Sequence, residues 1–220
     1  MKVFQNIDGG TIQSCREYDI APATKIEVGQ VVDLTTGLVT AHAAAGTGAI
    51  LGVAAEYHSG EADALNPRAN GTKILVYDAP GQVFVCKAPE MVALAGGSAT
   101  TLKATVAGAA DVYNGGYLKL VSKAEGSTNT DAIGTVYRIE DFATDAGTGT
   151  FTKAQGGVPS EGDVYALFMP VGFEGGNLDA KGCKIVVTAT AALPLRVVGR
   201  LEASGEIMVT PVKHLLGYKG

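Results

Sequence analysis

Residues 25–56 read KIEVGQVVDLTTGLVTAHAAAGTGAILGVAAE, and this stretch decides the fold class of the chain. Thr35-Thr36-Gly37 has the composition of a turn, and Leu38-Val39-Thr40 can return as the second strand of a hairpin. An extended backbone before that turn places apolar side chains of one parity on one face: Ile26, Val28, Val32 and Leu34. The stretch therefore predicts a β-hairpin.

The same stretch contains a third apolar segment, Ile50-Leu51-Gly52-Val53-Ala54, which we expect to add a third short strand. A helix competes poorly for this region because four glycines fall between Gly37 and Gly52. Each glycine inside a helix costs about 1 kcal/mol relative to alanine. We interpret residues 25–56 as a β-module.

The composition indicates a globular, turn-rich protein. The chain has 220 residues with 30 glycines, no tryptophan and 18% charged residues, and its 46% hydrophobic content is too high for a disordered chain. A chain of this length has room for one large or two small domains. We expect two β-rich halves.

Charge and cysteine usage exclude several classes of protein. The net charge is −5 and there is no run of Lys or Arg, so nucleic acid is not an expected partner. Cys15, Cys86 and Cys183 are widely spaced, which favours reduced thiols over a disulfide framework or a metal site. Without a signal peptide or about 20 consecutive apolar residues, we expect a soluble protein, made in a cytoplasm and not bound to membrane.

Residues 1–24 predict an extended N-terminal arm. A few apolar residues are scattered among polar ones, Gly9-Gly10 interrupts them, and Pro22 closes the segment: the apolar residues are Val3, Phe4, Ile7 and Ile12. Such an arm either frays or becomes ordered by adding a strand to a neighbouring subunit.

The middle of the chain predicts a second hairpin and a short helix. Lys73–Tyr77 and Gln82–Cys86 flank Asp78-Ala79-Pro80-Gly81, where Pro-Gly suits the central positions of a type II turn. Pro89–Ala95 has Pro and Glu at its start and Gly96-Gly97 at its end, which predicts a helix. The Ala- and Thr-rich residues 98–116 read as a linker.

The second half predicts a β-meander or barrel. Tyr117–Lys123 alternates Leu118 and Leu120 with lysines, as a half-buried strand does. Ser204-Gly205 can join the last two strands, and Pro211 should end the final strand or place it at an edge. Further strands are expected at residues 135–139, 150–152, 163–169, 184–190, 195–201 and 206–210.

The sequence offers weak candidates for bound groups. Gly46-Thr47-Gly48-Ala49-Ile50-Leu51-Gly52 resembles a dinucleotide-binding glycine pattern, but no buried strand precedes it and no β-α series surrounds it. We expect residues 25–56 to be β-structure, with Gly46 to Gly52 empty of cofactor. Asp141 and Asp145 lie in a stretch that lacks the spacing of a calcium loop, so a polar hairpin tip explains them better.

Catalytic chemistry also lacks support in the sequence. His42, His58 and His214 have no second ligand at metal-site spacing, and His58 is expected to be a solvated loop residue. No serine lies in a GxSxG elbow and no cysteine lies in a catalytic signature. We therefore expect no enzyme, no catalytic residue, no metal, no cofactor and no small-molecule substrate.

The first half resembles a family of phage proteins. IEVGQVVDLTTGLVTAHAAAGTGAILGVAAE, followed by GTKILVYDAPGQVFV, is similar to the capsid decoration (cement) proteins of tailed bacteriophages, over residues 26 to about 95. Residues 132–168, with GTFT and GDVY, look like a β-unit of phage virion proteins. The resemblance implies a β-tulip-like fold. We thus expect a mainly β chain with one or two short helices, divided into an arm (1–24), a β-tulip-like domain (25–110) and a second β-rich domain (111–220).

The resemblance also implies a function. The protein would be a structural virion protein that binds the outer capsid surface, bridges major capsid protein subunits, and forms a homotrimer. Its expected location is the virion, after synthesis in the host cytoplasm, and the expected capsid contacts are Val3, Phe4 and Ile7. The alternatives are a glycan- or host-surface-binding module, or a tail or head-fibre component. The 6% aromatic content and the absence of tryptophan speak against a sugar-stacking platform.

Overall fold

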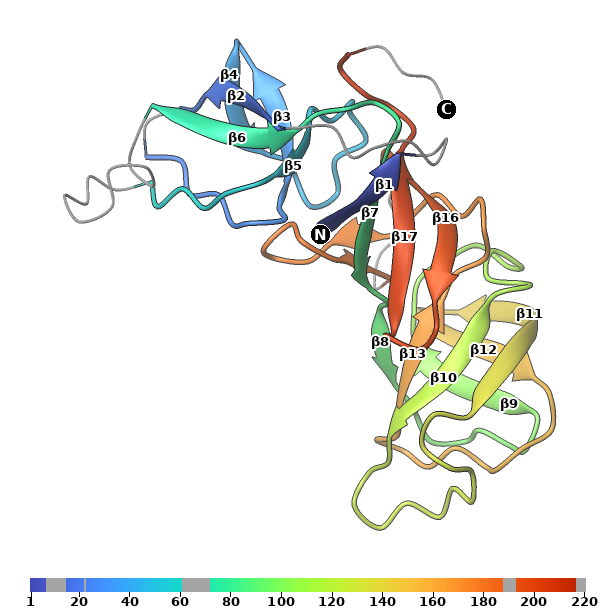
Figure 1. The fold of residues 1–220 in the computed structure, drawn as a ribbon. Helices are drawn as coiled ribbons and strands as arrows, with labels where there is room; N and C mark the ends of the chain where they lie inside the picture. The colour runs from blue at the N-terminus through green and yellow to red at the C-terminus, as the bar shows by residue number, and fades with distance from the viewer. Residues whose placement is uncertain (7–14, 22, 61–71, 188–192, 217–220) are drawn as a thin grey trace.

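The computed structural model describes residues 1–6, 15–21, 23–60, 72–187 and 193–216, and within them it contains 17 strands and no helix. The expected mainly β class is confirmed. Three larger antiparallel sheets and one short two-stranded sheet make up the fold. Figure 1 shows the five-stranded and six-stranded sheets at opposite ends of a central four-stranded sheet, so the molecule is elongated and bent.

The five-stranded sheet contains the module that the sequence predicted. Its hairpin joins β3 (Val31–Thr35) and β4 (Leu38–Ala41) through Thr36 and Gly37, whose φ angles of 50° and 84° suit the two central positions of a type I′ turn. Ile26, Val32, Val39, Leu51 and Ile74 form the buried face. The order is β2 (Arg16–Asp19), β6 (Lys73–Tyr77), β5 (Gly52–Ala54), β3 (Val31–Thr35) and β4 (Leu38–Ala41).

The central sheet joins the two ends of the chain. Its order is β1 (Lys2–Asn6), β7 (Gln82–Lys87), β17 (Glu206–Pro211) and β16 (Leu195–Leu201). The hairpin expected between β16 and β17 is confirmed, and β17 ends at Pro211 as expected. Because β17 pairs with both β7 and β16, it is an inner strand, although Pro211 was compatible with an edge.

The hairpin expected at Pro80-Gly81 is wrong, although its two strands are correct. β6 pairs with β2 and β5, whereas β7 pairs with β1 and β17. The chain does turn here, since the Gln82 N–H donates to the Ala79 carbonyl at 3.1 Å, but Gly81 lacks the positive φ of a type II turn. The turn therefore carries the chain from one sheet to the next.

The six-stranded sheet includes the segment expected to be a helix. Glu90–Val92 is strand β8, with Met91 buried between exposed Glu90 and Val92. The segment forms a strand and not a helix because its backbone pairs with β13 (Val164–Phe168), which buries one side chain and exposes the next. The order is β8, β13 (Val164–Phe168), β10 (Tyr117–Ser122), β11 (Val136–Asp145), β12 (Thr148–Lys153) and β9 (Thr101–Thr105).

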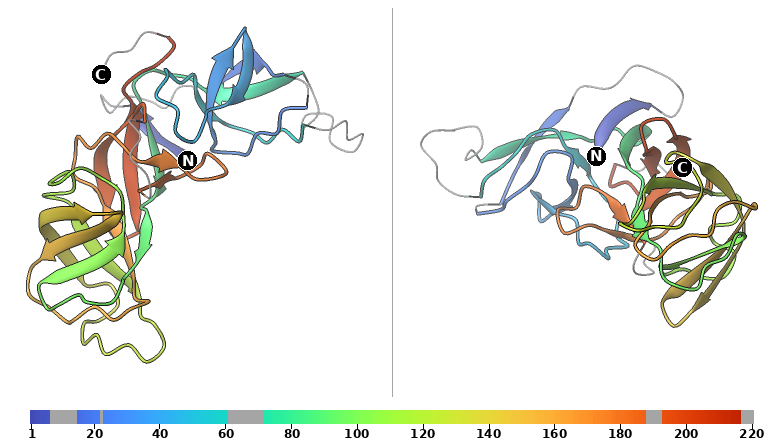
Figure 2. Two further views of the ribbon diagram at one scale, coloured as in Figure 1. Left: turned by 180° about the vertical axis from the view of Figure 1, so that it is seen from behind. Right: turned by 90° about the horizontal axis from the view of Figure 1, so that it is seen from below.

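The segment expected to be a linker also contributes to this sheet. β9 lies within it, and Leu102 and Ala104 are fully buried. The two edge strands approach each other through a bridge between Ala93 and Ala104, and the Leu94 N–H donates to the Lys103 carbonyl at 2.8 Å. The sheet curves strongly, as both views in Figure 2 show, without a continuous ladder that would make it a closed barrel.

The expected boundary near residue 110 does not separate the sheets. β7 from the first half is the neighbour of β17 from the second, and β8 and β9 belong to the sheet of β10–β13. One large core spans the central and the six-stranded sheets. Within it, the ring centroid of Tyr113 lies 4.7 Å from that of Phe142 and 5.4 Å from that of Phe173. The short strands β14 (Asn177–Leu178) and β15 (Ile185–Val186) add to the same core.

Candidate interaction surface

The N-terminal residues form strands within the chain, contrary to the expected free arm. β1 pairs with β7 and β2 pairs with β6, so two described parts of the N-terminal segment are held by the protein's own sheets. Val3 lies opposite Phe84 and is half-buried against the large core. Phe4 belongs to β1, but its side chain lies outside the described structure, as does all of Ile7.

β1 has an open outer edge. On one side it pairs with β7, and on the other side the described residues supply no strand. A bulge between Val3 and Gln5 interrupts its register. Open edges present unpaired backbone N–H and C=O groups, which makes β1 a candidate site for adding a strand of another protein.

Backbone from elsewhere in the chain meets the other sheet edges. At β16, the Val197 N–H donates to the Phe173 carbonyl at 3.0 Å and the Gly172 N–H donates to the Val197 carbonyl at 2.8 Å. In the five-stranded sheet, a bridge between Ile20 and Val39 connects the region of β2 to β4. The edge of β1 therefore stands out among those of the described sheets.

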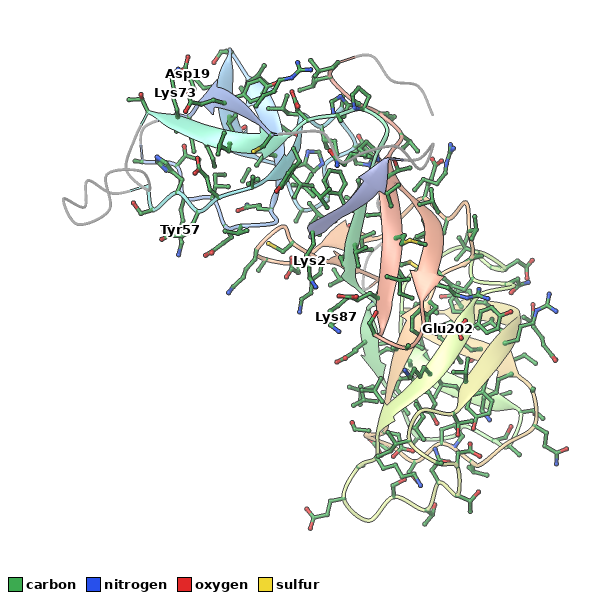
Figure 3. The ribbon with its side chains drawn as sticks, in the orientation of Figure 1. Lys2, Asp19, Tyr57, Lys73, Lys87 and Glu202 are labelled. Carbon is green, nitrogen blue, oxygen red and sulfur yellow. The ribbon has the colours of Figure 1, made fainter. Side chains whose placement is uncertain are left out.

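Charged residues surround β1. Lys2 Nζ lies 3.4 Å from Glu206 Oε1, and Lys87 Nζ donates to the Ser204 carbonyl at 2.7 Å. A hydrogen bond from Ser204 and the nearby ammonium groups of Lys2 and Lys87 lower the pKa of Glu206. Figure 3 shows Lys2 and Lys87 on the same side of the central sheet, so this carboxylate lies between two cations.

The start of β1 is anchored by its own main chain. The Met1 ammonium donates to the carbonyls of Gly29 at 2.5 Å and Cys183 at 3.1 Å. Burial lowers the pKa of this ammonium. Gly29 has a φ of 82°, and a Cβ there would lie 2.5 Å from the Met1 nitrogen, so only glycine permits this approach.

The histidines are buried, and the expectation that His58 is a solvated loop residue is wrong. His58 is 4% exposed, its Nδ1 lies 2.7 Å from the Thr24 carbonyl oxygen, and its backbone forms a bridge with Ile26. His214 accepts the Leu216 N–H on Nδ1 at 3.1 Å, and burial lowers its pKa. The His58 ring thus connects its loop to the segment around Thr24, whereas the His214 ring contacts its own turn.

His42 is the third buried ring, and it explains one glycine of the apparent nucleotide motif. Its Nδ1 lies 2.7 Å from Asp33 Oδ1, and its Nε2 lies 3.1 Å from the Gly46 carbonyl oxygen. A Cβ on Gly46 would lie 2.6 Å from this ring. The glycine therefore provides room for the imidazole.

Gly52, at the other end of the motif, permits a close approach of two strands. A Cβ at this position would lie 2.9 Å from the carbonyl carbon of Tyr77, and closer still to its oxygen. Gly48, between the two, has nothing within 4 Å of such a Cβ. The interpretation that glycines here allow close packing is confirmed at positions 46 and 52.

Among the residues that the structure describes, sequence reasoning missed three buried Asp or Lys side chains: Lys153, Asp163 and Asp78, which is 1% exposed. Lys153 is 1% exposed; its Nζ donates to the Ala99 carbonyl at 2.9 Å and lies 4.2 Å from the ring centroid of Tyr137. Burial lowers its pKa. A signal was present, because Lys153 shares the parity of Gly149 and Phe151, which point into the core along β12.

The second buried charge, Asp163, fixes the long connection between β10 and β11. It is fully buried and accepts hydrogen bonds from the Ala124 N–H and the Asn129 side chain, both at 3.0 Å, and from the Ser160 N–H at 3.1 Å. Burial raises the pKa of this carboxyl, but the hydrogen bonds outweigh burial and lower it overall. The role of Asp163 is to satisfy loop donors.

Neither a metal-binding group nor a membrane-spanning helix is present in the described ranges. No three His, Cys, Asp or Glu side chains in those ranges are grouped closely enough to hold a metal ion. Nor do those ranges contain a helix with the length and apolar character needed to cross a bilayer.

Comparison with known proteins does not identify a relative. No protein-family model, no curated protein and no solved structure matches the chain with significant similarity.

Proposed function

We propose that this chain is a structural virion protein that binds the outer surface of a tailed-phage capsid and bridges major capsid protein subunits, as a homotrimer. The sequence resemblance over residues 26 to about 95 supports the proposal. In the fold those residues supply β3 to β8, which contribute to all three larger sheets.

The observation that carries the proposal is the open outer edge of β1. A capsid segment running along this edge would satisfy its unpaired backbone groups, and side chains at alternate positions would set the specificity. Lys2 and the bulge at Phe4 discourage indiscriminate pairing of an exposed edge. Val3, Phe4 and Ile7 remain the proposed contacts, with Val3 acting from its half-buried position.

The physical basis is binding by many modest contacts. A symmetric shell repeats the same contact at each site, and a trimer engages three neighbouring subunits at once. Linked contacts of this kind reach an avidity far above that of one contact. The sheets of the chain would add rigidity without any covalent step.

The test is cryo-electron microscopy of expanded capsid shells with and without the purified chain. We expect added density at three-fold or quasi-three-fold positions, with the edge of β1 against the shell. Co-sedimentation of the chain with shells gives the matching solution measurement. A chain that stays monomeric and never binds expanded shells would refute the proposal.

A further inference from the structure

The segment that follows β17 connects the central sheet to the five-stranded sheet. Ile50, just before β5, donates its N–H to the Lys213 carbonyl at 3.1 Å, and its own carbonyl accepts the Leu215 N–H at 2.9 Å. These two hydrogen bonds form a parallel bridge between Ile50 and His214. In Figure 1 the chain leaves the upper end of β17 and turns there. We call residues 213–216 the C-terminal clamp.

The clamp is built around the ring of His214, which is buried. Its Nδ1 accepts the Leu216 N–H at 3.1 Å. A neutral imidazole has one donor and one acceptor nitrogen, so an accepting Nδ1 places the ring proton on Nε2. That Nε2 is buried and has no hydrogen-bond partner among the described residues. The closed clamp therefore requires a neutral ring in one particular tautomer.

A second proton on this ring opposes the closed clamp. It binds at Nδ1, the nitrogen that accepts the Leu216 N–H, and a protonated Nδ1 is itself a donor. Two N–H groups then face each other, so the hydrogen bond to Leu216 is lost. A buried cation whose donors lack acceptors is also costly. Protonation of His214 and closure of the clamp therefore exclude each other.

Asp78, just after β6, supplies the charge that acts on the His214 ring from the described part of the chain. Its carboxylate is buried; Oδ2 accepts the Tyr18 hydroxyl and lies 3.4 Å from Arg16 Nε, both on β2. Oδ1 has no hydrogen-bond partner within the described ranges. Asp78 thus offers a free acceptor to a protonated ring.

The remaining groups around the ring decide which form the closed clamp prefers. On the clamp itself, the Lys213 ammonium donates to the Thr47 carbonyl at 3.1 Å. Burial lowers the pKa of His214 and outweighs the charge of Asp78 and the Leu51 backbone, which both raise it. The closed clamp is therefore most stable above pH 6.5, and opening becomes easier as the pH falls below 6.5.

We propose that the C-terminal clamp is a pH-sensitive switch, closed around the neutral ring of His214 and released when this ring takes up a second proton. In acid the ring leaves the Leu216 N–H and turns toward Asp78 Oδ1. The backbone of Ile50 loses its two partners, and one connection between the central and five-stranded sheets opens. The switch does not depend on the proposed capsid partner.

The test is amide hydrogen exchange of the full chain at pH 7.5 and pH 5.5, corrected for the intrinsic rate at each pH. The amides of Ile50, Leu215 and Leu216 should open about tenfold more often in acid, as the loss of about one hydrogen bond predicts. The reference is the Leu94 amide, which donates to the Lys103 carbonyl at 2.8 Å in the six-stranded sheet. Its opening should not change with pH.

Two variants assign the response to one ring. In His214→Gln the side-chain carbonyl can still accept the Leu216 N–H but does not titrate, so the clamp amides should lose their pH response. The matched control, His58→Gln, replaces another buried histidine and should respond like the parent chain. Nitrogen NMR of the parent chain should place the ring proton of His214 on Nε2 at pH 7.5.

Each measurement can overturn the switch. A ring proton found on Nδ1 refutes it on the parent chain alone, even if His214→Gln does not fold. Clamp amides that open no more often in acid than the Leu94 amide also refute it. If His214→Gln keeps the pH response, or if His58→Gln loses it, a group other than His214 controls the clamp and the assignment is wrong.

Discussion

The imidazole of His42 lies 2.7 Å from the carboxylate of Asp33, and its other nitrogen faces the Gly46 carbonyl at 3.1 Å. Both neighbours are acceptors, so only the doubly protonated ring donates to both. Burial lowers the pKa of His42, but the hydrogen bonds to Asp33 and Gly46 outweigh burial and raise it above 6.5. In its protonated form the ring therefore donates to both neighbours and holds the loop after β4.

Asp33→Asn should destabilise the protein in a pH-dependent way. Because the folded pKa of His42 is raised, its stabilising contribution is full below pH 6.5 and is lost as pH rises through the folded pKa. Urea unfolding should show a deficit of about 1–2 kcal/mol near pH 5.5 and a smaller one near pH 8.5. Asp19→Asn, at an exposed position on β2, is the control. A deficit that does not change with pH would contradict the assignment.

Gly52→Ala should disrupt the contact between β5 and β6. The added Cβ would collide with the backbone carbonyl of Tyr77, which cannot move without breaking the β5–β6 pairing. We expect a loss of about 3 kcal/mol in the free energy of unfolding, the upper end for overpacking. Gly48→Ala is the matched control, because its Cβ meets nothing within 4 Å. Equal stability of the two variants would show that the strands separate easily here.

Asp163→Asn should loosen the connection between β10 and β11. An amide cannot accept all the hydrogen bonds that the carboxylate receives, so the variant should lose about 3 kcal/mol near neutral pH. The folded pKa of Asp163 is lowered, so its contribution is present above the ordinary value of 3.8 and lost as pH falls through the folded pKa. The difference in unfolding free energy between Asp163→Asn and the parent chain should therefore become smaller as the pH falls into the acid range. Asp145→Asn, at the exposed hairpin tip, should change stability little; if it matched Asp163→Asn, the special role of Asp163 would fail.

The sequence predicted strands better than it predicted their pairing. Alternation of apolar residues is a local property, and it located β3, β4, β6, β7, β16 and β17. Pairing depends on distant segments: β7 lies between β1 and β17, and Phe84 is opposite both Val3 and Val209. The Pro80-Gly81 turn carried no information about which sheet each strand would join. The helix at Pro89–Ala95 failed because capping signals were weaker than strand pairing with β13.

The candidate surface was harder to predict than the fold. The scattered apolar residues at the N-terminus gave no alternation, so β1 read as an arm until its pairing with β7 was known. Buried polar residues such as His58 could not be found from composition, because burial depends on what the rest of the chain places over them.

The pairing of β1 with β7 leads to a final prediction about the N-terminus. Deleting residues 1–6 removes the anchor of the Met1 ammonium, the ladder to β7 and the half-buried Val3. It exposes one side of β7, whose residues Gln82 to Cys86 are all buried. We expect a loss of about 3 kcal/mol and a fall in the thermal midpoint of about 10 °C.

A control separates this structural role from capsid binding. Lys2→Ala removes only the exposed ion pair with Glu206, and surface pairs of this kind contribute at most about 1 kcal/mol. The variant should therefore melt close to the parent chain. If the deletion also melted like the parent, β1 would act as a detachable arm, and the strand would have to leave β7 before it could bind a neighbour. A deletion that lowers the midpoint as expected would instead show that β1 is held in its own sheet, which leaves its outer edge for the proposed partner.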